Sequence, residues 1–357
     1  MSRVRVFVCV TAVLAAAMTF AGRAGSRPAA LAAERGAPAA APDADMQAVL
    51  DQLAKLGGKP LETLTPQQAR KQPTPADAVM ALLKQQGKST APETVAKVED
   101  RMIGGAAGQI PARVYWPAGD GPFPVLVYFH GGGWVIGSPI MYDASARALV
   151  NLARVVVVSV DYRKGPEHKF PAAHDDAFAA YQWAVKHAAA ISGDARRVAV
   201  GGESAGGNLA VTTAMAARDK QAPMPRHMLV VYPIAGSDTS TESYRLHANA
   251  KPLNKPMMEW FFIHALRNAT DRRDPRVNLA AANLKGLPET TLIRAEIDPL
   301  LSEGEMLGDR LKAAGVGTEA KTYDGVTHEF FGMGAAVAKA KQAQQHAATR
   351  LKAAFGQ

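Results

Sequence analysis

Cysteine is almost absent from this sequence, and its absence narrows the chemistry that the chain can perform. The single cysteine, Cys9, lies in the first apolar stretch. Once that stretch is removed, no thiol remains to form a disulfide, to act as a nucleophile or to bind a metal. The sequence also lacks a His/Asp/Glu cluster at metal-ligand spacing, which disfavours a metal-dependent hydrolase.

A block of basic residues and a basic-aromatic stripe are also absent, although the net charge is +9. Charge alone would permit nucleic-acid binding, but scattered charges are typical of a solvated basic surface. We therefore expect no nucleic-acid partner. There is no internal repeat, and 357 residues with 48% hydrophobic composition suffice for one large domain or two ordinary ones.

The first 24 residues have the pattern of a secretory signal peptide. Arg3 and Arg5 precede an uncharged apolar run at 6–20, and small residues follow it. A membrane anchor is the alternative, but the run is shorter than the roughly 20 residues that a span needs. We expect the leader to be removed, leaving no stable membrane span and an exported bacterial protein, periplasmic or secreted.

Composition and hydrophobic periodicity divide the remainder of the chain into three parts. Residues 25–45 are rich in alanine and proline, and we expect a flexible linker. Residues 46–97 hold three helical patterns, which predict cap helices over a site or simple N-terminal packing. Residues 98–357 alternate strand and helix patterns, and the long interval at about 236–287 is expected to be a cap insertion.

The alternation predicts an α/β fold with a mostly parallel sheet, helices on both of its faces and a helical cap. Segments 98–103 and 110–116 are expected to open it as an antiparallel pair. Long helices are expected at 170–191 and 330–355. The cluster at 257–262, Met-Met-Glu-Trp-Phe-Phe, is expected to form either ordinary core or an apolar wall above a site.

The segment Gly-Glu-Ser-Ala-Gly at 202–206 lies between an apolar run at 197–200 and a helical pattern at 208–218. A serine at such a strand-turn-helix junction presents its hydroxyl at the sheet edge as a nucleophile. The backbone N–H of Ala205 points at the same spot, where it would stabilise an oxyanion. A glycine-rich turn with a capping serine is the alternative. Ser204 is thus the candidate nucleophile.

An activated serine needs a histidine base and a carboxylate that orients it, in the chain order Ser, Asp/Glu, His for this type of turn. Asp298 follows an expected strand at 291–297 and precedes Pro299, which ends the strand. His328 is the only one of the 9 histidines in a loop after the last expected strand. Asp324 is the competing acid, but an Asp-Gly pair favours a turn, so we favour Asp298.

The tetrad His-Gly-Gly-Gly at 130–133 directly follows another expected strand. Its glycines leave the backbone N–H groups unshielded, so those of Gly131 and Gly132 can converge with that of Ala205 on an oxyanion. A flexible glycine loop is the alternative. We expect His130 to shape the loop rather than to act as the base.

Together these motifs resemble the bacterial hormone-sensitive lipase family of esterases, family IV. The tetrad at 130–133, the elbow at 202–207, Asp298-Pro299-Leu300 and His328 carry the resemblance, and the segment 161–173 adds to it. The resemblance spans about residue 46 to the C-terminus. It departs at Lys164-Gly165, Leu301-Ser302 and Glu203, which leaves substrate preference open but not the reaction class.

The resemblance implies an α/β-hydrolase fold and hydrolysis of short- to medium-chain carboxylic esters by Ser204, Asp298 and His328, without a cofactor. It also implies frequent pairing through the edge of the last strand, so a homodimer is one expectation. An amidase or deacetylase with the same triad is an alternative. A binding protein that has lost the catalytic histidine is another, and the presence of His328 argues against it.

Overall fold

Eight strands form one sheet in the computed structural model, which describes residues 40–357 of the chain. The expected leader at 1–24 lies outside the described residues, as does the expected linker up to residue 39. Between residues 40 and 357 no helix combines the length and apolarity needed to cross a membrane. Boundaries are β1 (Lys97–Gly105), β2 (Gly108–Trp116), β3 (Phe123–Phe129), β4 (Val156–Val160), β5 (Gly193–Glu203), β6 (Met228–Val231), β7 (Thr290–Ile297) and β8 (Thr318–Thr327).

The spatial order of the strands is β1-β2-β4-β3-β5-β6-β7-β8. β2 pairs antiparallel with both β1 and β4, and all other neighbours are parallel. The expected antiparallel opening pair is therefore confirmed. Every residue of β3 and β4 is buried, whereas the edge strands β1 and β8 include exposed positions. Central parallel strands covered on both faces favour such continuous apolar runs.

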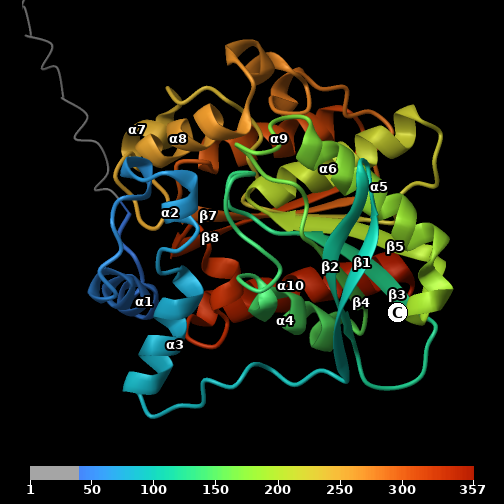
Figure 1. The fold of residues 1–357 in the computed structure, drawn as a ribbon, viewed down its shortest axis with the longest axis horizontal. Helices are drawn as coiled ribbons and strands as arrows, with labels where there is room; N and C mark the ends of the chain where they lie inside the picture. The colour runs from blue at the N-terminus through green and yellow to red at the C-terminus, as the bar shows by residue number, and fades with distance from the viewer. Residues whose placement is uncertain (1–39) are drawn as a thin grey trace, which may run out of the picture. The chain divides into compact units, whose positions relative to one another are not determined.

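Helices cover both faces of the sheet (Figure 1). The α-helices are α1 (Ala44–Lys55), α2 (Pro66–Ala69), α3 (Pro75–Gln85), α4 (Asp143–Ala153), α5 (Ala172–Lys186), α6 (Ala205–Asp219), α7 (Glu242–Leu246), α8 (Lys255–Ala265), α9 (Leu301–Ala313) and α10 (Ala338–Phe355). α5, α6 and α9 pack on one face, and α4 and α10 pack on the other. The predicted fold class, α/β with a mostly parallel sheet, is confirmed.

Two predicted helices are shorter than the sequence indicated. The helix expected at 170–191 begins only after Pro171, since a residue before proline is biased away from helical backbone. Its last residues form a separate 3₁₀ turn, η2 (Ala188–Ile191). The helix expected at 330–355 divides into the 3₁₀ turn η5 (Phe330–Met333) and α10, because Val337 has an extended backbone between them.

The sequence pattern predicts the last strand at 318–323, but β8 is longer, and this places His328 directly after it. β8 continues to Thr327, although its pairing with β7 shifts register beyond residue 323. Gly325, with φ +61°, forms the bulge, and its N–H donates to Glu296 Oε2 at 2.7 Å. Asp324 lies in this bulge and is exposed.

The N-terminal segment packs against the long insertion between β6 and β7. α1, α2 and α3 coincide with the three predicted helices, and Pro66 opens α2 next to a capping box formed by Thr65 and Gln68. The insertion carries α7, α8 and the 3₁₀ turns η3 (Ala269–Arg273) and η4 (Leu279–Ala281). The indole N–H of Trp260 in α8 donates to the Leu64 carbonyl at 3.0 Å, just after η1 (Leu61–Thr63). The domain limits at 46–97 and 236–287 stay predictions.

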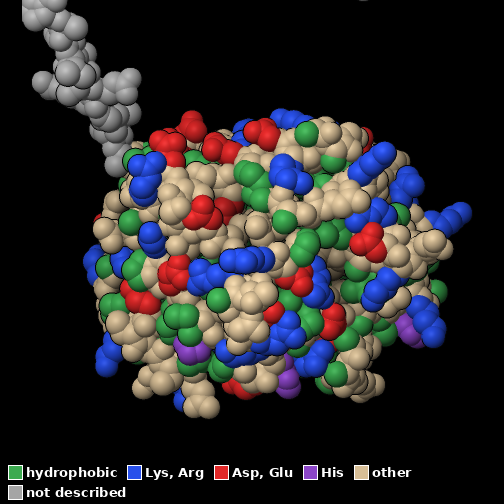
Figure 2. All heavy atoms as spheres, turned by 90° about the horizontal axis from the view of Figure 1, so that it is seen from above, with side chains coloured by type: hydrophobic (Ala, Val, Ile, Leu, Met, Phe, Trp, Pro, Cys, Tyr) green, Lys and Arg blue, Asp and Glu red, His purple; other side chains and the backbone are tan. Residues whose placement is uncertain are grey.

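Charges of both signs are mixed on the face of the molecule that Figure 2 draws. Lys and Arg side chains lie among Asp and Glu side chains over most of this face, and several basic side chains gather at the right-hand edge of the view. The scattered charge expected from the sequence is thus seen on this face, while the absence of a nucleic-acid partner stays a prediction.

Candidate active site

Ser204 lies at a sharp junction between β5, which ends at Glu203, and α6, which begins at Ala205. Its backbone has φ +57° and ψ −118°, a conformation that residues with a side chain rarely adopt. A Cβ at Gly206 would collide with the Phe129 carbonyl oxygen in the neighbouring strand. The glycines of the motif therefore allow the close approach that holds this strained turn.

His328 forms hydrogen bonds with both Ser204 and Asp298. Its Nδ1 lies 2.6 Å from Asp298 Oδ2, and its Nε2 lies 2.9 Å from Ser204 Oγ. All three side chains are buried. An ionised carboxylate only accepts, so Nδ1 carries the proton and Nε2 is free to accept the proton of the serine.

The structure brings Asp298, and not Asp324, to His328. Asp298 is buried at the end of β7, and its other oxygen, Oδ1, accepts the Leu300 N–H at 2.8 Å. Asp324 is exposed, and its backbone carbonyl accepts from Lys339 Nζ at 2.8 Å. The prediction that placed the acid at a strand end thus agrees with the observed geometry.

Burial and charge act in opposite directions on His328. Burial by itself lowers the pKa of the imidazole, whereas the charge of Asp298 and the hydrogen bond to it raise that pKa. The net direction is upward from the ordinary histidine value. A raised pKa makes the ring a better proton acceptor, as a general base requires.

The glycine tetrad lies beside Ser204 at the end of β3. Gly132 and Gly133 have φ +97° and +57°, and both line a cavity together with Ser204. Within residues 40–357 the N–H groups of Gly131, Gly132, Gly133 and Ala205 are not engaged by any backbone or side-chain acceptor. Gly131 does not line the cavity, so the lining favours Gly132 and Gly133 over the predicted pair Gly131 and Gly132.

His130 is buried behind this loop. Its ring stacks on Tyr162 with centroids 4.3 Å apart, and its Nδ1 lies 2.7 Å from the Gly131 carbonyl. Burial lowers the pKa of His130, so its ring is neutral at physiological pH. These contacts agree with the expected role in shaping the loop.

Two carboxylates near His328, the buried Glu203 and the partly buried Glu329, were not singled out from the sequence. Glu203 accepts hydrogen bonds from the hydroxyls of Tyr128 and Tyr232, at 2.6 Å for Tyr128. Glu329 accepts from Tyr142 at 2.8 Å, and its Oε1 lies 4.0 Å from His328 Nε2. Burial raises the pKa of both carboxyls, and the charge of Glu329 raises that of Glu203 further.

No local pattern marks Glu329, because its contact with Tyr142, 187 residues away in sequence, depends on how the chain folds. The only available signal was its place next to His328 in sequence. Glu203 was noted only as a departure from the resembled family. Of its two tyrosine partners, Tyr128 lies in β3 and Tyr232 directly follows β6.

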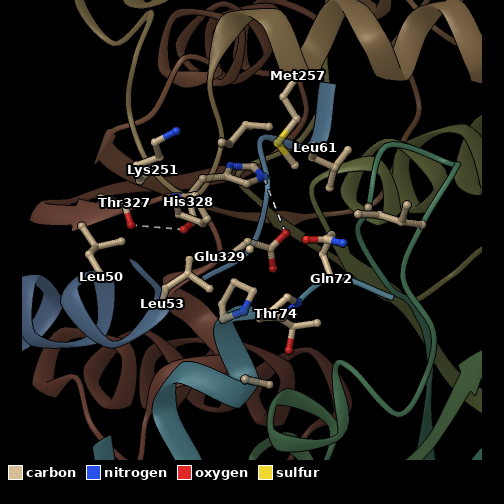
Figure 3. A pocket seen from close by; sticks show the side chains of 18 of the residues that line it. Leu50, Leu53, Leu61, Gln72, Thr74, Lys251, Met257, Thr327, His328 and Glu329 are labelled. Carbon is tan, nitrogen blue, oxygen red and sulfur yellow. Dashed lines mark hydrogen bonds and ion pairs between the residues drawn. The ribbon is translucent and has the colours of Figure 1, made fainter. Parts of the chain in front are cut away.

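A cavity of about 780 Å³ opens over Ser204 and His328. Figure 3 shows Leu50 and Leu53 of α1, Leu61 and Met257 around His328. Much of its apolar wall is formed by Leu50, Leu53, Leu61, Ile136, Leu253, Met257, Phe261 and Ile297. The expected apolar wall at 257–262 is seen in part, since Met257 and Phe261 line the cavity while Met258, Trp260 and Phe262 are buried elsewhere.

In the part of the chain that the structure describes, no group of three or more His, Cys, Asp or Glu side chains could hold a metal ion. The polar groups around Ser204 are hydrogen-bonded to one another instead. The arrangement places a serine hydroxyl, an imidazole nitrogen hydrogen-bonded to it and backbone N–H groups beside an apolar cavity.

A protein family described as having the alpha/beta hydrolase fold matches residues 126–332 of the chain. The carboxylic ester hydrolase LipN of Mycobacterium tuberculosis is 40% identical over 252 residues, which are 68% of this chain and 66% of LipN. An ethyl acetate hydrolase of Pseudomonas putida is 32% identical over 84% of this chain and 95% of the relative. Among solved structures, the hyperthermophilic esterase of Pyrobaculum calidifontis is similar, with a TM-score of 0.78 and 34% identity over 86% of this chain and 96% of the esterase.

Proposed function

Since the chain belongs to the α/β-hydrolase-fold family, among the esterases that resemble hormone-sensitive lipase, we propose that it is a serine carboxylesterase acting on short- to medium-chain esters. The observation that carries the proposal is the hydrogen-bonded series Ser204, His328 and Asp298 at the floor of an apolar cavity. The hydrolysed bond is the ester C–O bond.

In the first half of the reaction, Ser204 Oγ attacks the ester carbonyl carbon while His328 Nε2 takes the hydroxyl proton. Asp298 keeps the proton on Nδ1 and stabilises the imidazolium that forms. The imidazolium then gives its proton to the leaving alcohol, the C–O bond breaks, and an acyl-enzyme remains. Water attacks that acyl group with His328 again as base, which releases the acid and restores Ser204.

The negative charge on the carbonyl oxygen is stabilised by backbone N–H groups. The proposed donors are Gly132 and Gly133, which line the cavity, and Ala205, whose N–H follows the nucleophile directly in the chain. Each such donor contributes about 3 kcal/mol to lowering the barrier. The involvement of Gly131 stays a prediction from the sequence. Because these donors are in place before reaction, little reorganisation is needed when the charge develops.

A panel of p-nitrophenyl esters from acetyl to palmitoyl tests the proposed reaction and its chain length. We expect kcat/KM to be highest for short to medium acyl groups, because a relative that is 32% identical is named an ethyl acetate hydrolase. The matching p-nitroanilides serve as controls for amide hydrolysis. Faster cleavage of the anilides, a maximum at palmitoyl, or binding without turnover would each contradict the proposal.

Activity is expected to fall as the pH is lowered towards acid, because protonated His328 cannot accept the serine proton. The pKa of His328 is raised by Asp298, so the midpoint of kcat/KM should lie above the ordinary histidine pKa of about 6.5. The profile is measured from about pH 5 to about pH 9 on one ester, with unfolding monitored in parallel. A profile that rises with acidity over this range would exclude His328 as the base.

Export from a bacterial cell is also proposed, on the leader pattern at 1–24 alone. N-terminal sequencing of the protein recovered from a periplasmic extract would identify the cleavage site. Recovery of the uncleaved chain in the cytoplasm would contradict export.

A further inference from the structure

Arg70 connects the N-terminal helices to the loop that carries the proposed oxyanion donors. It follows the last residue of α2, and its guanidinium donates four hydrogen bonds. Nε donates to the Val135 carbonyl at 2.9 Å, and Nη2 donates to the Gly165 carbonyl at 2.7 Å. Both terminal nitrogens donate to the carboxylate of Glu167, at 2.8 and 2.7 Å. Only the planar fork of an arginine satisfies this set of acceptors.

Two of these acceptor residues, Val135 and Gly165, also donate backbone hydrogen bonds to the loop that contains Gly132. The Val135 N–H donates to the Gly132 carbonyl at 3.0 Å, which closes a turn over the glycines. The Gly165 N–H donates to the Trp134 carbonyl at 2.8 Å. Arg70 donates to the carbonyls of Val135 and Gly165, so one side chain connects the turn at Gly132 to the segment at Gly165.

The turn needs outside support because its backbone is strained. Gly132, Gly133 and Trp134 are three consecutive residues with φ of +97°, +57° and +59°. A residue with a Cβ rarely adopts the last of these conformations. Such a conformation persists only when its surroundings hold it, and Trp134 is itself buried.

α2 is also anchored to the cap insertion. Leu64, two residues before the start of α2, accepts the indole N–H of Trp260 in α8 at 3.0 Å. Arg70 and Gln72 both line the cavity, and Figure 3 labels Gln72 there. The segment at 64–72 therefore contacts the insertion, the cavity and the oxyanion loop together.

We propose that Arg70 is a positioning residue for ester hydrolysis, which holds the turn of Gly132 through the carbonyls of Val135 and Gly165. The N-terminal helices then contribute to transition-state stabilisation in addition to covering the cavity. Arg70 touches neither the reacting atoms nor the triad in this arrangement. The inference rests on the proposed esterase function.

The test compares Arg70→Met, Arg70→Lys and Glu167→Gln with Lys71→Met, a control at the exposed neighbouring residue. For Arg70→Met we expect kcat to fall by about tenfold to a hundredfold with KM changed by less than about threefold, since a small displacement of oxyanion donors acts on the transition state. Arg70→Lys should recover part of the loss. Glu167→Gln leaves the hydrogen bonds of Arg70 to both carbonyls in place, so its kcat should fall less than that of either Arg70 variant. The kcat of Lys71→Met should match that of the wild type.

An alkylboronic acid gives a second measurement that a merely structural role would not affect. Its boron bonds to Ser204 Oγ as the serine proton moves to His328, and the tetrahedral anion mimics the transition state. The inhibition constant should rise in Arg70→Met by the same factor as kcat falls, while thermal unfolding moves little. If Arg70→Met does not fold, Arg70→Lys and Glu167→Gln provide the same comparison.

Two results separate this inference from the function on which it rests. An active wild type with unchanged kcat but raised KM in the Arg70 variants would overturn the inference alone, since Arg70 would then serve substrate binding only. Unchanged boronic acid inhibition in Arg70→Met would overturn it as well. A well-folded wild type that hydrolyses no ester would overturn both.

Discussion

Replacing Ser204 with alanine is expected to remove nearly all ester hydrolysis, lowering kcat by about four to six orders of magnitude. The substitution deletes the Oγ that lies 2.9 Å from His328 Nε2, and with it the atom that bonds to the acyl group. The cavity stays open, so a non-hydrolysed ester analogue should bind as it does to the wild type. Turnover of the preferred p-nitrophenyl ester is the measurement.

The fold should survive this substitution because only one oxygen is lost. The backbone strain at Ser204 is unchanged, since alanine also carries a Cβ, and the interaction that is lost is the hydrogen bond of the hydroxyl with His328. Ser240→Ala, the same change at an exposed serine of the insertion, is the matched control. Substantial turnover by Ser204→Ala, with a normal unfolding temperature, would exclude Ser204 as the nucleophile.

Asp298→Asn is expected to lower kcat by about 10⁴-fold while the structure stays intact. Asp298 Oδ1 accepts the Leu300 N–H at 2.8 Å, so the amide oxygen of asparagine would remain there. Its NH₂ group would then face His328 Nδ1, 2.6 Å from the present Oδ2. An NH₂ donor forces the imidazole proton onto Nε2, where it blocks transfer from Ser204.

Asp324→Asn is the control, because Asp324 was the competing acid in the sequence and lies exposed in the bulge of β8. Its kcat should equal that of the wild type. The reverse result, a normal Asp298→Asn and an inactive Asp324→Asn, would reassign the acid. Steady-state kinetics of both variants on one ester, with circular dichroism as a check of folding, decide between the two residues.

Much of the fold could be predicted because its signals are local. The alternation of apolar strands with helices indicated a mostly parallel sheet, and the sheet order confirms it. Three helical patterns were expected within 46–97, and α1, α2 and α3 lie there, with a capping box of Thr65 and Gln68 at the start of α2. The strand-turn-helix junction at Ser204 could be predicted for the same reason, since the glycines that permit the sharp turn lie within a few residues of it in sequence.

The predicted ends of strands and helices were wrong where contacts with another segment determine them. β8 continues past 323 through a bulge at Gly325, because pairing resumes between Thr327 and Ile297. The predicted single helix at 330–355 is interrupted, and the Phe331 carbonyl of the first turn accepts from Gln344 at 2.7 Å instead. Neither partner is close in sequence, so periodicity could not reveal it.

The sequence by itself determined the fold class and the identities of Ser204, His328 and Asp298 as candidates, because chain order and strand-end position depend on short-range patterns. Only the tertiary structure decided which acid faces Nδ1, which glycines reach the cavity, and that Glu329 lies 4.0 Å from His328 Nε2. The contacts of Arg70 were also decided only by the tertiary structure, since its partner Glu167 lies 97 residues further along the chain. Side-chain contacts across such separations depend on how helices and strands pack, and no local pattern encodes that packing.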